Sequence, residues 1–205
     1  MKIVTISREF GSGGREIGKR LADILGFDYY DREIISSLSS EEEYKASFYN
    51  DSSDVFSWQS VPITFRHSFA VPMIMNQPQT QMILEQKRII ESIAEKGRDC
   101  IFVGRNADVI LGKYDPFKIF VCADLEAKLT RCEERASAGE KLSRKQLEHN
   151  MRRIDKNRAT AREFICDLKW GEPSSYNMTI NTTDWDIKVL SNALAGIINS
   201  YFGEK

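Results

Sequence analysis

The sequence lacks any apolar run long enough to cross a membrane. None of its apolar stretches approaches the roughly 18 consecutive residues that a spanning helix requires. The first residues also lack the layout of a secretory signal peptide, because they begin directly with a strand-like pattern. We therefore expect no membrane association and a protein of the cytoplasm.

Cysteine and histidine are too sparse to indicate a zinc site or a disulfide framework. His67 lies in a segment without a visible positioned partner, so we interpret it as a surface residue rather than a base. The four cysteines show no CxxC spacing, which favours reduced thiols of the cytoplasm: Cys100, Cys122, Cys132 and Cys166.

An excess of either charge is also lacking. The chain has 29 Lys and Arg against 30 Asp and Glu, so no overall field directs it to nucleic acid or to a membrane surface. It has no internal repeat and no linker-like break in composition. A length of 205 residues then predicts a single α/β domain over 1–205. Within it, 40–79 has no steady period and is interpreted as a variable insertion.

Short apolar runs alternate with helical patterns along the rest of the chain. This alternation predicts a parallel sheet sandwiched between helices, a three-layer α/β/α fold. In such a sheet the carboxyl ends of the strands face the ligand. Strands are expected at 3–6, 27–31, 100–103, 118–122 and 176–181, and helices at 17–25, 80–96, 125–136 and 185–202.

A glycine-rich loop lies between the first strand and the first helix. Gly11-Ser12-Gly13-Gly14 follows the apolar run and precedes the helical pattern. Glycines let backbone N–H groups approach phosphate oxygens, and the start of a helix adds its positive dipole. The loop is therefore predicted to bind phosphate. The alternative is a glycine-rich turn without a ligand.

The loop departs from the usual phosphate-binding pattern GxxxxGK[ST]. With Gly13 as its last glycine, Arg8 stands at the first glycine and Gly14 at the lysine. Arg15 then stands at the hydroxyl position and is the nearest cation, so we expect it to contact the transferring phosphates. Glu16 follows and would repel phosphates unless a metal lies between them, which makes it a candidate Mg²⁺ ligand.

Charged residues also follow two other predicted strands. Asp31 and Arg32 lie at the carboxyl end of the second strand, and Arg105 follows the strand at 100–103. Because strand ends face the ligand, the Asp31-Arg32 pair can contact a substrate. The alternative is that Asp31 caps the helical segment that begins at Arg32.

The segment 128–162 is strongly basic. It contains 11 Lys and Arg and five Asp and Glu, a local charge of +6. Arg131 and Arg135 are four residues apart, as are Arg158 and Arg162, so each pair shares one helix face. Such arginines suit a clamp on phosphate groups, although a basic helix is often only a solvated face. We interpret the segment as a mobile lid, because its central part has few apolar residues.

Five stretches of the chain together match one known family pattern. They are ISREFGSGGREIGKRLADILGFDYYDREII (6–35), FVGRNADVIL (102–111), KIFVCADLEAKLTR (118–131), RRIDKNRATAREF (152–164) and KWGEPSSYNMTINT (169–182). The combination resembles the cytidylate kinase-like family of P-loop nucleoside monophosphate kinases. It implies a P-loop NTPase-like α/β/α fold with a helical lid.

The resemblance also implies a reaction, transfer of the γ-phosphoryl group of ATP to CMP or dCMP with Mg²⁺. The partner would be a small nucleoside monophosphate. The implied site residues are the ATP loop (Gly11, Ser12, Gly13, Gly14, Arg15 and Glu16), the monophosphate site (Asp31, Arg32 and Arg105), Arg131 near the adenine or phosphates, and a lid run (Arg153, Asp155, Arg158 and Arg162).

The chain departs from cytidylate kinases at two places. Gly14-Arg15-Glu16 stands where they carry a lysine and a hydroxyl residue, and Asn106 stands where they carry an aspartate. A nucleotide-binding regulatory protein without kinase activity is therefore the alternative. Nucleic-acid binding is a weaker interpretation, because the basic segment has few aromatic residues for base stacking. The sequence does not indicate an oligomeric state.

Overall fold

A five-stranded parallel sheet lies at the centre of the computed structural model, which describes residues 1–38, 77–136 and 142–203. The strand order is β2-β3-β1-β4-β5. The strands are β1 (Ile3–Arg8), β2 (Asp28–Tyr30), β3 (Cys100–Val103), β4 (Phe117–Cys122) and β5 (Met178–Asn181). The helices are α1 (Gly14–Leu25), α2 (Arg32–Ser37), α4 (Gln77–Glu95), α5 (Ala107–Ile110), α6 (Leu125–Arg135), α7 (Arg144–Ile165) and α8 (Ile187–Gly203), with short 3-10 turns at Gly112–Tyr114 and Pro173–Ser175.

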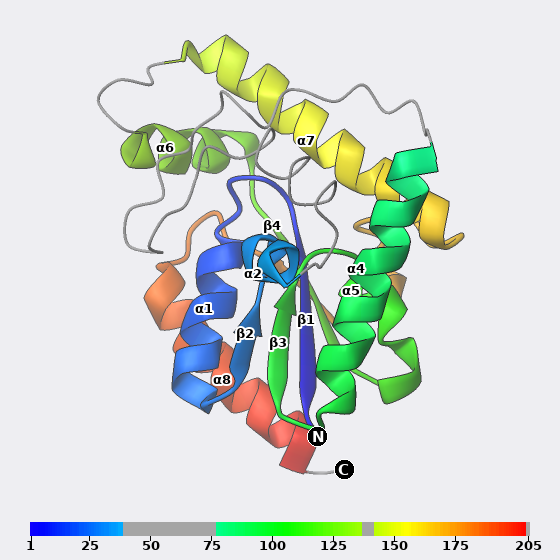
Figure 1. The fold of residues 1–205 in the computed structure, drawn as a ribbon. Helices are drawn as coiled ribbons and strands as arrows, with labels where there is room; N and C mark the ends of the chain where they lie inside the picture. Colours follow the sequence, from blue (N-terminus) through cyan, green and yellow to red (C-terminus); the bar gives the residue numbers. More distant parts are fainter. Residues whose placement is uncertain (39–76, 137–141, 204–205) are drawn as a thin grey trace.

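Helices cover both faces of the sheet (Figure 1). On one face α1 and α8 pack against β1, β3 and β4, and Leu21 and Leu194 lie in that core. On the other face α2, α4 and α5 form a second core that includes Ile35, Ile90 and Phe102. Covered on both faces, β1 is buried from Ile3 to Ser7, and β3 is a continuous, buried apolar run. The three-layer α/β/α fold predicted from the sequence is confirmed.

The helices α6 and α7 lie across the carboxyl ends of the strands (Figure 1). They have a small core of their own, in which Leu129 and Cys132 of α6 contact Leu147 and Met151 of α7. Phe10 of the glycine-rich loop packs against this cluster. The segment expected to form the lid is therefore helical in the part that the structure describes, and it rests on the loop.

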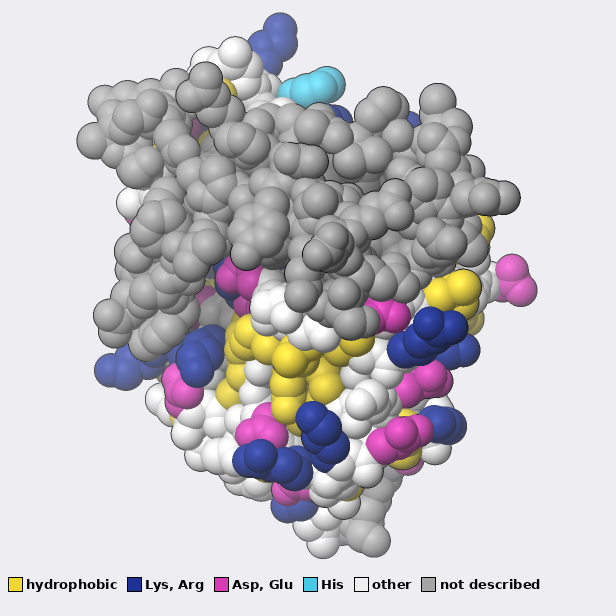
Figure 2. Space-filling view, viewed as in Figure 1, with side chains coloured by type: hydrophobic (Ala, Val, Ile, Leu, Met, Phe, Trp, Pro, Cys, Tyr) yellow, Lys and Arg dark blue, Asp and Glu magenta, His cyan; other side chains and the backbone are white. Residues whose placement is uncertain are grey.

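The predicted elements are found with small shifts at their ends. The strand at 100–103 is confirmed, whereas the helix expected at 80–96 spans Gln77–Glu95. Most of the insertion at 40–79 lies outside the described residues, as does 137–141 within the lid. No helix among the described residues is long and apolar enough to cross a membrane. On the face shown in Figure 2, Lys and Arg side chains lie among Asp and Glu over the described surface.

Candidate functional site

Two glycines shape the loop between β1 and α1. Gly11 and Gly13 adopt left-handed backbone conformations, with φ of +76° and +81°. An added Cβ atom would lie 3.1 Å from Cβ of Lys128 at Gly11 and 2.8 Å from Cδ1 of Ile187 at Gly13. Conformation and crowding thus both favour glycine. Gly13 also gives α1 no side-chain cap, which suits a helix start that receives an anion.

The helix α7 holds the loop through its backbone. The Phe10 N–H donates to Oδ1 of Asp155 at 2.8 Å, and Nη1 of Arg158 donates to the Arg8 carbonyl oxygen at 3.0 Å. Arg158 also donates to Asp155 at 3.0 Å, and its guanidinium lies 5.9 Å from the Phe10 ring centre. Burial raises the pKa of the Asp155 carboxyl. Two of the predicted lid residues, Asp155 and Arg158, therefore lie at the loop.

The helix α6 and the turn after β5 hold the loop from another direction. Nζ of Lys128 pairs with Oε2 of Glu9 at 2.8 Å. Arg131 donates to the hydroxyl of Thr182 at 3.0 Å and to its carbonyl oxygen, and that hydroxyl donates to the carbonyl oxygen of Ser12 at 2.8 Å. Arg131 is thus joined to the predicted ATP loop through Thr182. Its contact with adenine or phosphates stays a prediction.

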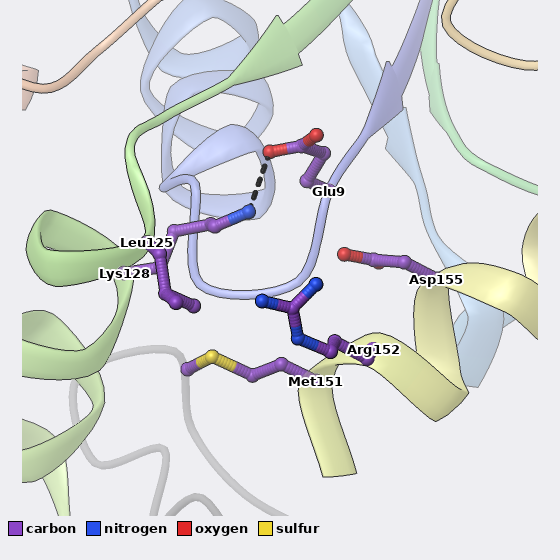
Figure 3. Close-up of a pocket in the computed structure, with 6 residues that line it drawn as sticks. All are labelled: Glu9, Leu125, Lys128, Met151, Arg152 and Asp155. Atoms are coloured by element: carbon purple, nitrogen blue, oxygen red, sulfur yellow. Dashed lines mark hydrogen bonds and ion pairs between the residues drawn. The ribbon is translucent and has the colours of Figure 1, made fainter. Parts of the chain in front are cut away.

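A cavity of about 340 Å³ lies between the loop and the two lid helices. Figure 3 shows the Lys128–Glu9 pair on one side of it and side chains of α7 on the other. The cavity therefore has both acidic and basic walls. Its lining residues are Glu9 from the loop, Leu125 and Lys128 from α6, and Met151, Arg152 and Asp155 from α7.

Arg15 lies against acidic residues of the α2 region. Its Nε donates to Oδ2 of Asp31 at 3.0 Å, and its Nη2 pairs with Asp31 at 2.8 Å and with Glu33. Burial by itself lowers the pKa of Arg15, but the two carboxylates outweigh burial, so the pKa is raised. The protein thus balances this charge before any ligand binds. The contact of Arg15 with phosphates stays a prediction.

Glu16 is held between two arginines. Oε1 accepts from Nε of Arg20 at 2.9 Å, and Oε2 pairs with Arg135 of α6. No group of three His, Cys, Asp or Glu side chains in the described part of the chain could hold a metal ion. Kinase sites hold Mg²⁺ through one or two carboxylates together with phosphate oxygens and water. To bind Mg²⁺, Glu16 would have to release Arg20 or Arg135. Its role as a metal ligand stays a prediction.

Asp31 caps α2, as one of the two sequence interpretations proposed. Its Oδ1 accepts from the N–H groups of Glu33 at 3.0 Å and Ile34 at 3.2 Å, and its Oδ2 accepts from the Tyr29 hydroxyl at 3.2 Å. The side chain is almost completely buried. Arg32 is the first residue of α2. Contacts of Asp31 and Arg32 with a monophosphate stay predictions.

A left-handed turn follows β3. Gly104, Arg105 and Asn106 have φ values of +80°, +59° and +52°. Left-handed backbone costs about 1–2 kcal/mol for most residues with a side chain, so this turn is strained at Arg105, whereas asparagine adopts such a conformation more readily. The Asn106 side chain donates to the Ala161 carbonyl oxygen of α7 at 3.3 Å. The turn places Arg105 at the carboxyl edge of the sheet, where the sequence predicted it.

Arginines gather where β1 and β3 end. Burial, together with the positive charges of Arg158 and Arg105, lowers the pKa of Arg8 to about 9. Burial also lowers the pKa of Arg158, although Asp155 opposes this, and the charge of Arg32 adds to the lowering. Cations that are removed from water and placed near one another favour an anion between them.

Arg162 has a different environment from Arg158. Its Nη1 pairs with Oδ2 of Asp108 at 2.6 Å, and the side chains are only 1% and 2% exposed. Its Nε donates to the Leu168 carbonyl oxygen at 3.2 Å, and its guanidinium lies 5.3 Å from the Tyr176 ring centre. Arg162 therefore fastens the end of α7 to α5. The roles of Arg162 and of the half-buried Arg153 at phosphates stay predictions.

The profile of the cytidylate kinase-like family matches residues 3–184 of the chain. The chain belongs to this family. The match confirms the resemblance found in the sequence and spans the loop, both strand ends and the lid helices. No curated protein sequence matches the chain.

Solved structures show the same fold. An uncharacterized protein from Eubacterium ventriosum has a TM-score of 0.71 and 22% identity, over 98% of this chain and 99% of that one. Shikimate kinase from Bacteroides thetaiotaomicron has a TM-score of 0.58 and 9% identity, over 97% and 98%. Shikimate kinase from Acinetobacter baumannii, solved with shikimate, has a TM-score of 0.51 and 12% identity, over 98% and 94%. The cytidylate kinase-like chain thus shares the P-loop kinase fold.

Sequence reasoning missed three residues of this cytidylate kinase-like site. Arg8 was noted only as a departure from the loop pattern, although it lies among the arginines at the strand ends. Asp108 and Thr182 bind Arg162 and Arg131 from distant parts of the chain. The one signal in the sequence was that Arg8 and Gly14 depart from the pattern together, within the same loop.

Proposed function

We propose that this chain is an ATP-dependent nucleoside monophosphate kinase that phosphorylates CMP or dCMP. The observation that carries the proposal is the gathering of Arg8, Arg105 and Arg158 at the carboxyl ends of β1 and β3, beside a glycine-rich loop. Phosphoryl transfer requires positioning and positive charge around a dispersed negative transition state, and little covalent chemistry. Membership of the cytidylate kinase-like family supports the same assignment.

We assign the donor phosphates and the acceptor phosphate to different parts of the site. The backbone N–H groups at the start of α1 would receive the ATP phosphates, because the helix dipole and the glycines favour an anion there. Arg32 and Arg105 would hold the monophosphate. Arg158 would lie between the two, since it already contacts the loop. ATP would arrive with Mg²⁺, which neutralises phosphate charge during transfer.

The lid helices would exclude water from the transferring group. Both contact the loop, Lys128 of α6 through Glu9 and Asp155 of α7 through the Phe10 N–H. A closed lid prevents water from accepting the phosphoryl group. ATP, free monophosphates and reduced thiols occur together in the cytoplasm, which is the compartment that this proposal implies. The four cysteines lie among the described residues as free thiols.

The test is a screen of all ribo- and deoxyribonucleoside monophosphates with ATP and Mg²⁺, in which ADP release is measured. We expect the highest kcat/KM for CMP or dCMP. Arg98→Met is the matched control, because Arg98 is an exposed arginine that pairs with Asp28 at the amino ends of β2 and β3, away from the site. Preferred turnover of a different monophosphate would show that this compound, and not CMP or dCMP, is the phosphoryl acceptor. No turnover of any monophosphate by the folded protein would overturn the kinase proposal.

A nucleotide-binding regulatory protein without kinase activity is the second candidate. The observation that favours it is that Arg15 and Glu16, which stand where kinases carry a hydroxyl residue and its successor, are both held in ion pairs. Calorimetric titration with ATP and CMP separates the two candidates. Binding without turnover supports the regulatory function, and binding with turnover excludes it.

A further inference from the structure

Arg8 and Gly14 are neighbours in space as well as joint departures from the loop pattern. An added Cβ atom at Gly14 would lie 2.6 Å from Cβ and 3.0 Å from Cγ of Arg8. Real Cβ atoms do not approach so closely, and both contacts are near the backbone end of Arg8, where the side chain cannot swing away. While Arg8 is present, no larger residue fits at position 14. A lysine there is excluded by the arginine at position 8.

The far end of Arg8 also lies over a glycine. An added Cβ atom at Gly104 would overlap Nη1 of Arg8 and lie 2.8 Å from its Cζ. Gly104 has a left-handed φ of +80°, which itself favours glycine. Gly14 and Gly104, from distant parts of the chain, therefore both leave room for the side chain of Arg8. Arg8 begins at the end of β1, passes Gly14 and ends over the end of β3.

The surroundings of this guanidinium are basic. Arg158 and Arg105 are close enough for their charges to lower the pKa of Arg8. Tyr29 and Asp31 act in the opposite direction on this pKa, and Asp31 already pairs with Arg15 and caps α2. Within residues 1–38, 77–136 and 142–203, no side chain forms an ion pair with the Arg8 guanidinium. A charge taken from water without a partner is costly, and an anionic ligand would remove that cost.

We propose that Arg8 supplies, from the end of β1, the phosphate-binding charge that a P-loop lysine supplies from the start of the helix. Compared with the usual loop pattern, Arg8 stands in place of the first glycine and Gly14 stands in place of the lysine, an exchange of cation and glycine. The proposed ligand is a phosphoryl group held between the ends of β1 and β3. An arginine offers this group a two-pronged hydrogen bond where a lysine offers a point charge. The inference rests on the proposed function only in assigning the phosphoryl group to a nucleotide.

The first experiment measures affinity by calorimetric titration with inorganic phosphate, CMP and the non-hydrolysable ATP analogue AMP-PNP. Arg8→Met keeps the length and apolar packing of the side chain and removes its charge. We expect it to weaken phosphate binding about 10- to 100-fold, as expected for hydrogen bonds to a charged group. Arg8→Lys should recover part of the loss. Arg98→Met, at the opposite edge of the sheet, is the control and should bind as the wild type does.

The two nucleotides identify the source of the phosphoryl group. A loss confined to CMP assigns Arg8 to the acceptor phosphate, and a loss confined to AMP-PNP assigns it to the donor phosphates. A folded Arg8→Met protein that binds all three probes as tightly as the wild type overturns the inference. So does a wild-type protein that binds none of them.

The second experiment tests the exchange itself. Gly14→Lys alone should destabilise the protein, because the new side chain collides with Arg8. Arg8→Gly alone should lose phosphate affinity. The double variant Arg8→Gly with Gly14→Lys should be more stable than Gly14→Lys alone and bind phosphate more tightly than Arg8→Gly, a non-additive result expected of neighbours. Additive losses in the double variant would contradict the exchange.

The outcomes separate this inference from the proposed kinase function. Phosphate affinity that depends on Arg8, in a protein without turnover, supports the inference and overturns the kinase proposal. Turnover of CMP with unchanged kcat, KM and phosphate affinity in Arg8→Met supports the kinase and overturns the inference.

Discussion

The arginines at the carboxyl edge of the sheet form two groups that differ in what balances their charge. Arg15 and Arg162 lie against carboxylates, and these raise their pKa values although burial alone would lower them. Arg8 lies near other arginines, and Arg158 lies between Asp155 and other arginines; burial lowers both pKa values, and at Arg158 the carboxylate does not outweigh it. A charge balanced within the protein suits a structural role, whereas a charge left for a ligand suits binding.

Helical spacing cannot separate these two groups. Arg158 and Arg162 are one turn apart on α7 and look alike in the sequence, yet one contacts the glycine-rich loop and the other a buried aspartate. The acid that distinguishes them, Asp108, belongs to another helix. The role of each arginine on a basic helix face therefore depends on the residues that it contacts. Substitutions can test that role.

The largest expected effect is the loss of folding stability in Arg162→Met. Removing one partner of a buried ion pair leaves the other charge unpaired, so we expect the free energy of unfolding to fall by about 3–5 kcal/mol. Urea denaturation measures this fall. Combining Arg162→Met with Asp108→Leu should cost less than Arg162→Met alone. The exposed pair of Arg152 is the control, since such pairs contribute less than about 1 kcal/mol.

Arg158→Met tests whether the arginines with lowered pKa values act on the ligand. If Arg158 stabilises the transferring phosphoryl group, its loss should lower kcat by about 10²–10³-fold, the usual effect of removing one preorganised donor. Steady-state kinetics with the best acceptor from the monophosphate screen measure kcat, and urea denaturation shows whether the fold persists. A stable variant with wild-type kcat would place Arg158 with the structural arginines.

The pH dependence of phosphate binding also distinguishes Arg8 from the arginines whose charge is balanced by carboxylates. Arg8 faces Arg158 of α7, Arg105 after β3, and Tyr29 and Asp31 of the β2 region. Because burial and the neighbouring cations lower its pKa to about 9, we expect Arg8 to lose charge as the pH rises through 9 and inorganic phosphate to bind more weakly, by up to about tenfold per pH unit. Calorimetry between pH 7 and pH 10 measures this slope. The slope should be absent in Arg8→Met; an equal slope in that variant would assign it to another group.

Arg15→Met should have the smallest effect on catalysis. Because Asp31 and Glu33 already balance its charge, we expect kcat to fall by about tenfold or less, the scale of ordinary hydrogen bonds that position α2. The same kinetic assay measures it. A fall of about 10²–10³-fold would instead support the hypothesis from the sequence, in which Arg15 contacts the phosphates.

The fold was largely predictable because its signals are local. The apolar run at Cys100–Val103, the glycines after β1 and the face of α8 each reveal an element without knowledge of the others. The capping role of Asp31 was also open to prediction, since an aspartate before a helical segment commonly caps it.

The partners of the site residues were less predictable because they come from distant parts of the chain. Arg15 meets Glu33, and Glu16 meets Arg135 of α6. Gly104 follows β3 and makes room for Arg8, which lies at the end of β1. A pattern of spacing within one element carries no information on such pairs. The joint departure of Arg8 and Gly14 from the loop pattern was the exception.

The attachment of the loop to α7 uses main-chain atoms, the Phe10 N–H and the Arg8 carbonyl oxygen. Movement of α7 away from the sheet must therefore break these bonds or pull the loop with it. If nucleotide enters only after that release, the observed rate of association will rise with nucleotide concentration and then level off at the opening rate. Asp155→Asn, which weakens the attachment to Phe10, should raise that plateau.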